Sequence, residues 1–283
     1  MRKHNAQVLP FATAALALAI STVASAQEPA GKGARLEEVV VTAQRREQSM
    51  QDVPVAVTAL SSASLAQSGV GNTEMLSVAA PSVVIGRFSN SARPFVRGIG
   101  STVADPNNEA SVAIYLDGVY QPAAFANFFD FNNVERIEVL KGPQGTLFGR
   151  NATGGVIQVV TRDPGDSPEL ELSAGYANYD KYSVSAYAAA PIGDKVGVSI
   201  AAMYSDQQEG YGRNLVSGKD VRLGDDVGVR AKLVFEPTDA TTIKLAADYS
   251  ELDDSGAAYQ MLPGTRNVLG QEPPQDDYDV YNN

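Results

Sequence analysis

The chain has 283 residues, of which 44% are hydrophobic, and it carries a formal net charge of −11 at pH 7. Such an acidic balance argues against a nucleic-acid partner, because phosphates attract a basic surface. There is no cysteine, and the one histidine is His4. These counts exclude a disulfide framework, the usual zinc sites and Ser–His or Cys–His nucleophile pairs from the rest of the chain. We therefore expect no enzyme, no metal site and no cofactor.

Residues 1–26 have the features of a secretion signal. Arg2 and Lys3 give a basic start, Val8–Val23 is largely apolar, and Ala24–Ala26 offers a small-residue cleavage site. Polar residues and a proline interrupt the apolar run, which disfavours a spanning helix. We expect cleavage after Ala26 and export, and loss of two basic residues changes the net charge from −11 to −13.

Residues 27–50 are expected to be a flexible segment that contains one strand-forming stretch. Gln27–Leu36 is polar and small, which favours disorder. Glu37–Ala43 (EEVVVTA) then brings three consecutive valines without a recognisable partner strand nearby. Such a run is often an ordinary short strand. It could also add itself to the sheet edge of another protein through main-chain hydrogen bonds.

Residues 51–164 have the pattern of a small mixed α/β domain. Ser61 is expected to cap a helix that runs to Gln67 and stops at Gly69. Asn72 is expected to cap a second helix, which ends before Pro81. A third, aromatic helix is expected at 126–131. Strand-like stretches lie at 53–60, 82–85, 94–97, 112–116, 134–140 and 155–161.

The block Val134–Pro164 concentrates charge and glycine. Its first strand carries four charged residues, and buried charges that are tolerated only in pairs would form a releasable latch. An exposed charged strand is the alternative. The glycines that follow are expected to allow tight turns. Gly142–Gly145 lacks the Gly-Lys-Ser/Thr ending of a phosphate-binding loop.

After Pro164 the sequence alternates between apolar and polar residues over stretches of roughly 10 residues. Short connections at 191–195 and 236–240 alternate with long polar ones at 206–224 and from 253 onward. This combination is typical of a transmembrane barrel with periplasmic turns and extracellular loops. A soluble β-sandwich would give a similar alternation.

Four blocks in this order resemble the plug domain of TonB-dependent outer-membrane receptors. They are Glu37–Leu60, Arg93–Gly100 (RPFVRGIG), Tyr115–Tyr120 (YLDGVY) and Val134–Pro164. The resemblance implies a plug at 51–164 that blocks a 22-stranded barrel, of which 165–283 would supply about five strands. It also implies a position in the outer membrane in contact with its lipid, and partnership with TonB, ExbB and ExbD.

The resemblance also assigns expected roles to individual residues. The TonB box would be Glu37, Glu38, Val39, Val40, Val41, Thr42 and Ala43. The plug latch and its turns would comprise Arg97, Gly98, Asp117, Gly118, Glu135, Arg136, Glu138, Lys141, Gly142, Pro143, Gly149, Gly154 and Gly155. The resemblance also implies that the backbone at these glycines lies close to the barrel wall. Ligand contacts are expected in apical loops, at Arg87, Asn90, Arg93, Asn107 and Asn108.

The predicted function is TonB-dependent active transport of a scarce solute, with a ferric siderophore as the expected substrate. After Gly165 only 118 residues remain, too few for a closed barrel. We therefore expect the sequence to be truncated, with its last stretch forming an extracellular loop. The alternative is a soluble secreted or periplasmic binding module without transport activity, whereas a carboxylate-based hydrolase has only the abundance of acidic residues in its favour.

Overall fold

The computed structural model describes residues 40–42, 46, 48–88, 91–101, 110–122, 133–215, 217–221 and 223–254. The predicted signal peptide, most of the segment 27–50, the predicted helix at 126–131 and the stretch after residue 254 lie outside the described residues. No helix among the described residues is long and apolar enough to cross a membrane.

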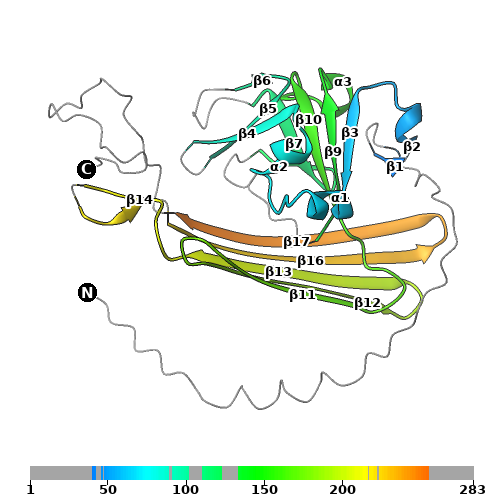
Figure 1. The fold of residues 1–283 in the computed structure, drawn as a ribbon. Helices are drawn as coiled ribbons and strands as arrows, with labels where there is room; N and C mark the ends of the chain where they lie inside the picture. Colours follow the sequence, from blue (N-terminus) through cyan, green and yellow to red (C-terminus); the bar gives the residue numbers. More distant parts are fainter. Residues whose placement is uncertain are drawn as a thin grey trace, which may run out of the picture. The chain divides into compact units, whose positions relative to one another are not determined.

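A five-stranded mixed sheet forms the centre of the first domain, here called the plug after its expected role (Figure 1). Its strands lie in the order β3 (Val57–Ser61), β9 (Val134–Lys141), β10 (Gly155–Thr161), β7 (Val112–Leu116) and β8 (Val119–Tyr120). Only the β10–β7 pair in it is parallel. Because the two faces bury different apolar clusters, one around Ile137 and Ile157 and one around Leu140 and Val156, its strands are rich in branched aliphatic residues.

The helices of the plug are short. Helix α1 (Ser62–Gln67) begins as predicted, because the Ser61 hydroxyl accepts the Ser64 N–H at 3.2 Å, and Gly69 follows it with φ +67°. Helix α2 (Leu76–Ala79) is shorter than predicted, since Asn72 accepts the Met75 N–H and closes a turn before the helix. Helix α3 is Gly145–Phe148.

Two smaller sheets complete the plug. A three-stranded one contains β4 (Val83–Phe88), β5 (Ser91–Val96) and β6 (Ile99–Gly100). A two-stranded one pairs β1 (Val40–Val41) with β2 (Gln48–Ser49), and a 3-10 turn at Met50–Asp52 follows. The expectation that the valine run has no partner strand nearby is therefore wrong for Val40 and Val41. A local hairpin satisfies their backbone.

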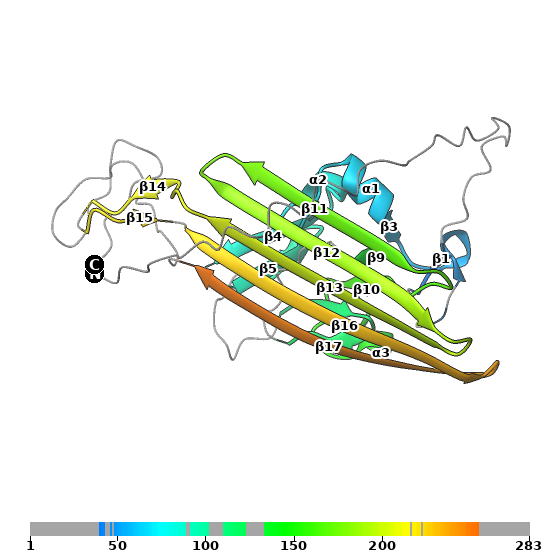
Figure 2. The same ribbon diagram turned by 90° about the horizontal axis from the view of Figure 1, so that it is seen from below.

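The second large sheet is antiparallel throughout, and its five long strands run side by side (Figure 2). In order, they are β11 (Glu169–Ala177), β12 (Lys181–Ile192), β13 (Val196–Gln207), β16 (Gly224–Thr238) and β17 (Thr241–Asp254). A small hairpin of β14 (Gly212–Arg213) and β15 (Asp220–Val221) lies in the long connection between β13 and β16.

The two faces of this sheet differ in the way that the alternation predicts. The register aligns Leu172, Ala186, Ala202, Val229 and Tyr249 across all five strands. Large apolar side chains on that face are exposed, with Leu172 at 72%. The opposite face carries buried polar groups such as Lys232. A strand that faces lipid on one side and a polar interior on the other has this pattern. It does not favour a soluble module, which would bury the apolar face.

Candidate functional site

Four residues form a polar cluster inside the plug, here called the Glu138 latch: Thr42, Arg136, Glu138 and Gln158. Arg136 and Glu138 lie two residues apart on β9, so their side chains share one face of the sheet. Gln158 stands directly opposite Glu138 in the neighbouring strand β10. The strand pattern thus brings three of the four side chains together, and Thr42 approaches from the end of β1.

Glu138 accepts hydrogen bonds from both the backbone and the side chain of Thr42. The Thr42 N–H donates to both carboxylate oxygens, at 2.8 and 3.0 Å, and the Thr42 hydroxyl donates to Oε1 at 3.0 Å. Gln158 donates its amide N–H to the same hydroxyl. The donor and acceptor functions of the threonine hydroxyl are therefore both satisfied, which is what burial of a polar group requires.

Arg136 provides the positive charge of the latch. Its Nε donates to Glu138 Oε1 at 2.9 Å, and Glu135 binds the other end of the guanidinium. Burial acts to lower the pKa of Arg136, but the hydrogen bond to Glu138 and the charges of Glu135 and Glu138 outweigh it and raise that pKa overall. The guanidinium thus stays charged beside a carboxylate whose side chain is 0% exposed.

Apolar contacts hold the same segment. The Val41 side chain is 0% exposed and belongs to the cluster that contains Leu140 and Phe148. Fully burying a valine side chain contributes about 1.5–3 kcal/mol. Val41 and Thr42 are therefore docked on the plug by packing and by hydrogen bonds together.

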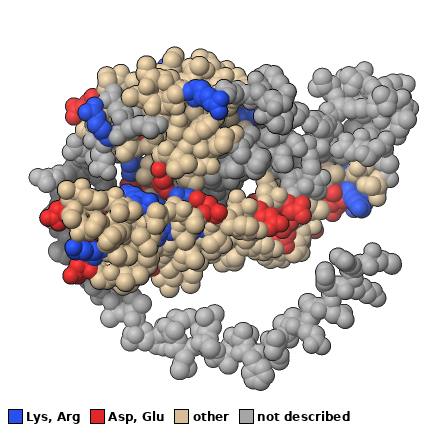
Figure 3. All heavy atoms as spheres, turned by 180° about the vertical axis from the view of Figure 1, so that it is seen from behind, with Lys and Arg blue, Asp and Glu red and all other residues tan. Residues whose placement is uncertain are grey.

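A second polar cluster joins the plug to the long sheet, and is here called the Asp163 clamp. Its members come from the ends of plug strands and from the polar face of β16 and β17: Asp117, Thr161, Asp163, Arg230, Lys232 and Lys244. Figure 3 shows basic and acidic side chains beside one another on the face of the molecule seen from behind.

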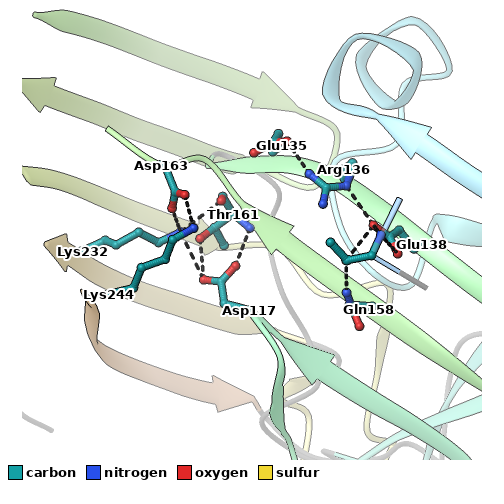
Figure 4. Close-up of polar contacts among 10 residues, drawn as sticks. Asp117, Glu135, Arg136, Glu138, Gln158, Thr161, Asp163, Lys232 and Lys244 are labelled. Carbon is teal, nitrogen blue, oxygen red and sulfur yellow. Dashed lines mark hydrogen bonds and ion pairs between the residues drawn. The ribbon is translucent and has the colours of Figure 1, made fainter. Parts of the chain in front are cut away.

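Lys232 lies at the centre of the clamp. Its ammonium group donates to Asp163 Oδ1 at 2.9 Å and to the Thr161 carbonyl at 3.0 Å, and lies 3.4 Å from Asp117 Oδ2. Lys244 binds the other oxygen of Asp163, and Arg230 binds Asp117 (Figure 4 shows the two lysines). Three cations thus share two carboxylates.

Asp117 also organises the plug strands around it. Its carboxylate accepts the Thr161 N–H at 2.8 Å and the Thr161 hydroxyl at 2.7 Å. Asp117 and Gly118 form the two-residue turn between β7 and β8 with φ of +47° and +80°, a conformation that favours Asp–Gly. One side chain therefore serves a hairpin turn, a neighbouring strand and the clamp.

The connection from β10 to β11 carries further charge. Arg162 forms a bidentate pair with Glu171, at 2.7 and 2.6 Å, and lies 4.0 Å from the centre of the Tyr187 ring. The hydrogen bond to Glu171 is the main reason why the pKa of Arg162 is raised, against the effect of burial. Beside it, burial acts to raise the pKa of Asp163, but the lysine hydrogen bonds and charges lower it overall.

The predicted latch differs from the observed one. Glu135, Arg136 and Glu138 come together as expected, whereas Lys141 continues β9 and donates its backbone N–H to Ala56. The partners that the structure shows for Glu138 lie within the plug and its valine strand. Asp117 and Asp163, in contrast, take their counter-charges from Arg230, Lys232 and Lys244 of the long sheet.

Most of the predicted turn residues have the backbone of turns, with positive φ angles at Arg97, Gly98, Asp117, Gly118, Gly142 and Gly149. Gly155 also has a positive φ, but it begins strand β10 and is not part of a turn. At Gly154 a Cβ would lie 2.9 Å from Ile99 Cγ2 and 3.2 Å from Val112 Cγ2, so no side chain fits. That close approach is to plug strands and not to a barrel wall, which corrects the expected role of this glycine. Pro143 follows Gly142 between β9 and α3.

The predicted ligand residues do not form a described site. Asn90, Asn107 and Asn108 lie outside the described residues, as do Glu37, Glu38, Val39 and Ala43 of the predicted box. Arg87 and Arg93 lie on β4 and β5, where Arg93 pairs with Gly86. Among the described residues no group of three or more acidic or histidine side chains could hold a metal ion.

Sequence reasoning missed the clamp. In the motif TRDP, Thr161 ends the last plug strand and Asp163 follows it. Arg230, Lys232 and Lys244 occupy the polar positions of alternating strands. Three basic residues on the polar face of two adjacent strands were a usable signal. The role of Gln158 could not be read, because it depends on the register of β9 and β10.

Comparison with known proteins agrees with this architecture. Residues 49–156 match the model of the TonB-dependent receptor plug domain. The chain is 27% identical over 224 residues to the pesticin receptor of Yersinia enterocolitica, covering 78% of this chain and 33% of the relative. It is 29% identical over 203 residues to the vitamin B12 transporter of Vibrio cholerae, covering 69% and 31%.

A solved structure shows the same fold. The ferric yersiniabactin uptake receptor of Yersinia pestis superposes with a TM-score of 0.64 at 27% identity, over 70% of this chain and 32% of that one. The chain thus spans about a third of the length of the relatives that it matches. The chain thus carries a TonB-dependent receptor plug domain followed by antiparallel strands, in the arrangement of the transport receptors that it resembles.

Proposed function

We propose that the protein takes part in TonB-dependent active uptake of a scarce solute across the outer membrane, with the plug gating a barrel. The observation that carries this proposal is a plug domain clamped to the polar face of a sheet whose other face is apolar and exposed. A plug in that place blocks passage, so uptake requires energy to rearrange it. Because the chain covers a third of its relatives, the rest of a barrel is part of the proposal.

The proposed substrate is a ferric siderophore. The relatives include a ferric yersiniabactin uptake receptor and a vitamin B12 transporter, so two classes of scarce solute are represented among them. The proposed energy source is TonB with ExbB and ExbD, which would engage the box at Glu37–Ala43. Selection among solutes is assigned to Arg87 on β4 and Arg93 on β5, together with Asn90, Asn107 and Asn108, which lie outside the described residues.

The proposed division of the chain follows from the same function. Residues 1–26 would be a cleaved signal, 27–50 the segment that carries the TonB box, 51–164 the plug and 165–283 the first part of the barrel. The match of residues 49–156 to the plug-domain model supports the third of these segments, 51–164, most directly.

Replacing Val40 by proline in the full-length protein tests the proposal. Proline lacks the backbone N–H that strand pairing needs, so energised uptake should be abolished while surface binding persists. The measurement compares binding and accumulation of radiolabelled ferric siderophores and of cyanocobalamin in cells, with Val40→Ala as the control. Uptake by Val40→Pro at the rate of the control would refute the box assignment, and recovery of the protein in the soluble periplasmic fraction would refute the membrane assignment.

A further inference from the structure

The backbone N–H of Thr42 has an unusual partner. A strand normally directs its N–H groups to the backbone carbonyls of its neighbour, as in the pairing of β1 with β2. The N–H of Thr42 instead donates to both oxygens of Glu138, 96 residues further along the chain. Each residue has one backbone N–H, so this donor is already engaged.

We propose that Glu138 competes with a partner strand for the backbone of Thr42. The partner that fits the valine segment is an extended strand, which would bind it by main-chain hydrogen bonds. This inference therefore rests on the proposed function. It adds the plug residue that controls access to the box. While Thr42 is docked, a partner that pairs along the segment as far as residue 42 lacks one of the donors that it needs. Glu138 therefore acts as a positioning residue that holds the segment in a form unable to pair fully.

The surroundings of Glu138 are built for such a contact. Its neighbours in the sheet are Gln158 on one side and Ala59 on the other. Gln158 holds the Thr42 hydroxyl, and Ala59 is too small to reach the carboxylate and compete with Thr42 for it. Arg136 lies on the same strand as Glu138 and donates a hydrogen bond to its carboxylate, so the carboxylate is oriented independently of Thr42.

The contact between Thr42 and Glu138 is strong enough to keep the segment docked and weak enough for a partner strand to displace it. Hydrogen bonds to a charged group typically change an equilibrium by about 10- to 100-fold each. Thr42 donates to Glu138 from its N–H and from its hydroxyl, and two hydrogen bonds of this kind keep the undocked form rare. A partner that binds only the undocked form then has its apparent affinity reduced by the undocked fraction.

Hydrogen exchange in the purified full-length protein tests the docking step. The Thr42 amide should exchange slowly, and Glu138→Gln should accelerate it by about 10-fold or more, because a neutral amide is a weaker acceptor than a carboxylate. Gln158→Met removes only the hydrogen bond to the Thr42 hydroxyl and should give a smaller acceleration. This variant replaces Glu138→Gln in the test if Glu138→Gln folds poorly. Glu135→Gln is the matched control, since it removes a charge beside Arg136 without touching Thr42.

Binding of the purified periplasmic domain of TonB, without solute, tests the competition. Glu138→Gln and Gln158→Met should lower its Kd, the first by about 10-fold or more, and Glu135→Gln should leave it unchanged. A residue with a merely structural role would not tighten binding. Unchanged exchange in Glu138→Gln, or faster exchange with an unchanged Kd, overturns the competition alone. Absence of TonB binding in every variant overturns the box assignment and the competition with it.

Discussion

The Glu138 latch and the Asp163 clamp are both clusters of paired charges, yet they are built differently. The latch has one carboxylate, 0% exposed, with one arginine and two neutral polar groups. The clamp has two partly exposed carboxylates that share three cations. The latch joins a short strand to the plug, whereas the clamp joins the plug to the long sheet.

The two clusters differ in how many cations each carboxylate contacts. In the clamp, loss of one cation leaves each carboxylate with another, so the joint as a whole persists. In the latch, loss of Arg136 leaves a buried carboxylate without its cation, and loss of Glu138 leaves Thr42 without its acceptor. A joint that must open needs few and specific contacts, and a joint that must hold needs several that back one another up. The structure therefore points to the valine strand as the part that releases first.

The largest effect is expected from Arg136→Ala. Removing one partner of a buried ion pair leaves the other charge uncompensated and typically costs about 3–5 kcal/mol. Denaturant titration should show this loss as a lower midpoint of plug unfolding. The control is Arg213→Ala, which removes an exposed pair with an N–O distance of 3.7 Å and should cost about 0–1 kcal/mol. Equal losses in the two variants would contradict the buried latch.

The next largest loss of stability is expected from Lys232→Met. The Lys232 side chain is 5% exposed and binds three oxygens, so its loss should cost about 1–3 kcal/mol. Lys244→Met should cost under about 1 kcal/mol, because that side chain is 56% exposed. Since both lysines bind Asp163, the double variant should depart from additivity by about 0.5 kcal/mol or more. Strict additivity would show that the clamp is not redundant.

Val41→Ala should weaken docking by about 1–2 kcal/mol, since two buried carbon atoms are lost from a packed site. The global unfolding midpoint should change less, because β1 is a short peripheral strand. Trypsin cleavage after the exposed Arg46 reports the docked fraction and should become about 5- to 30-fold faster. Val55→Ala, at a partly buried site in the same cluster, is the control. Cleavage at the same rate in both variants would show that Val41 does not hold the segment.

Much of the fold was accessible to sequence reasoning, because it depends on local pattern. The capped helix at Ser61, the Asp117–Gly118 turn and the five alternating strands follow from residue type and period. The end of the valine run was misjudged, because its partner Gln48–Ser49 has no strand pattern of its own. The clamp was missed since it joins residues up to 115 positions apart, Asp117 and Lys232, and such contacts depend on how the plug and the sheet pack.

The smallest effect is expected from acidification of the clamp. The lysine hydrogen bonds overcome burial and lower the pKa of Asp163 below its ordinary value of 3.8. A carboxylate with a lowered folded-state pKa contributes stability that is present above its unfolded pKa and is lost as the pH falls through the folded value. The stability difference between wild type and Asp163→Asn should therefore be constant above about pH 4 and shrink below it. Unfolding midpoints at a series of pH values measure it, with Asp220→Asn as the exposed control. A difference that persists unchanged to about pH 2 would show that the charge of Asp163 does not hold the clamp, whereas a loss that begins near neutral pH would place the sensitive group elsewhere.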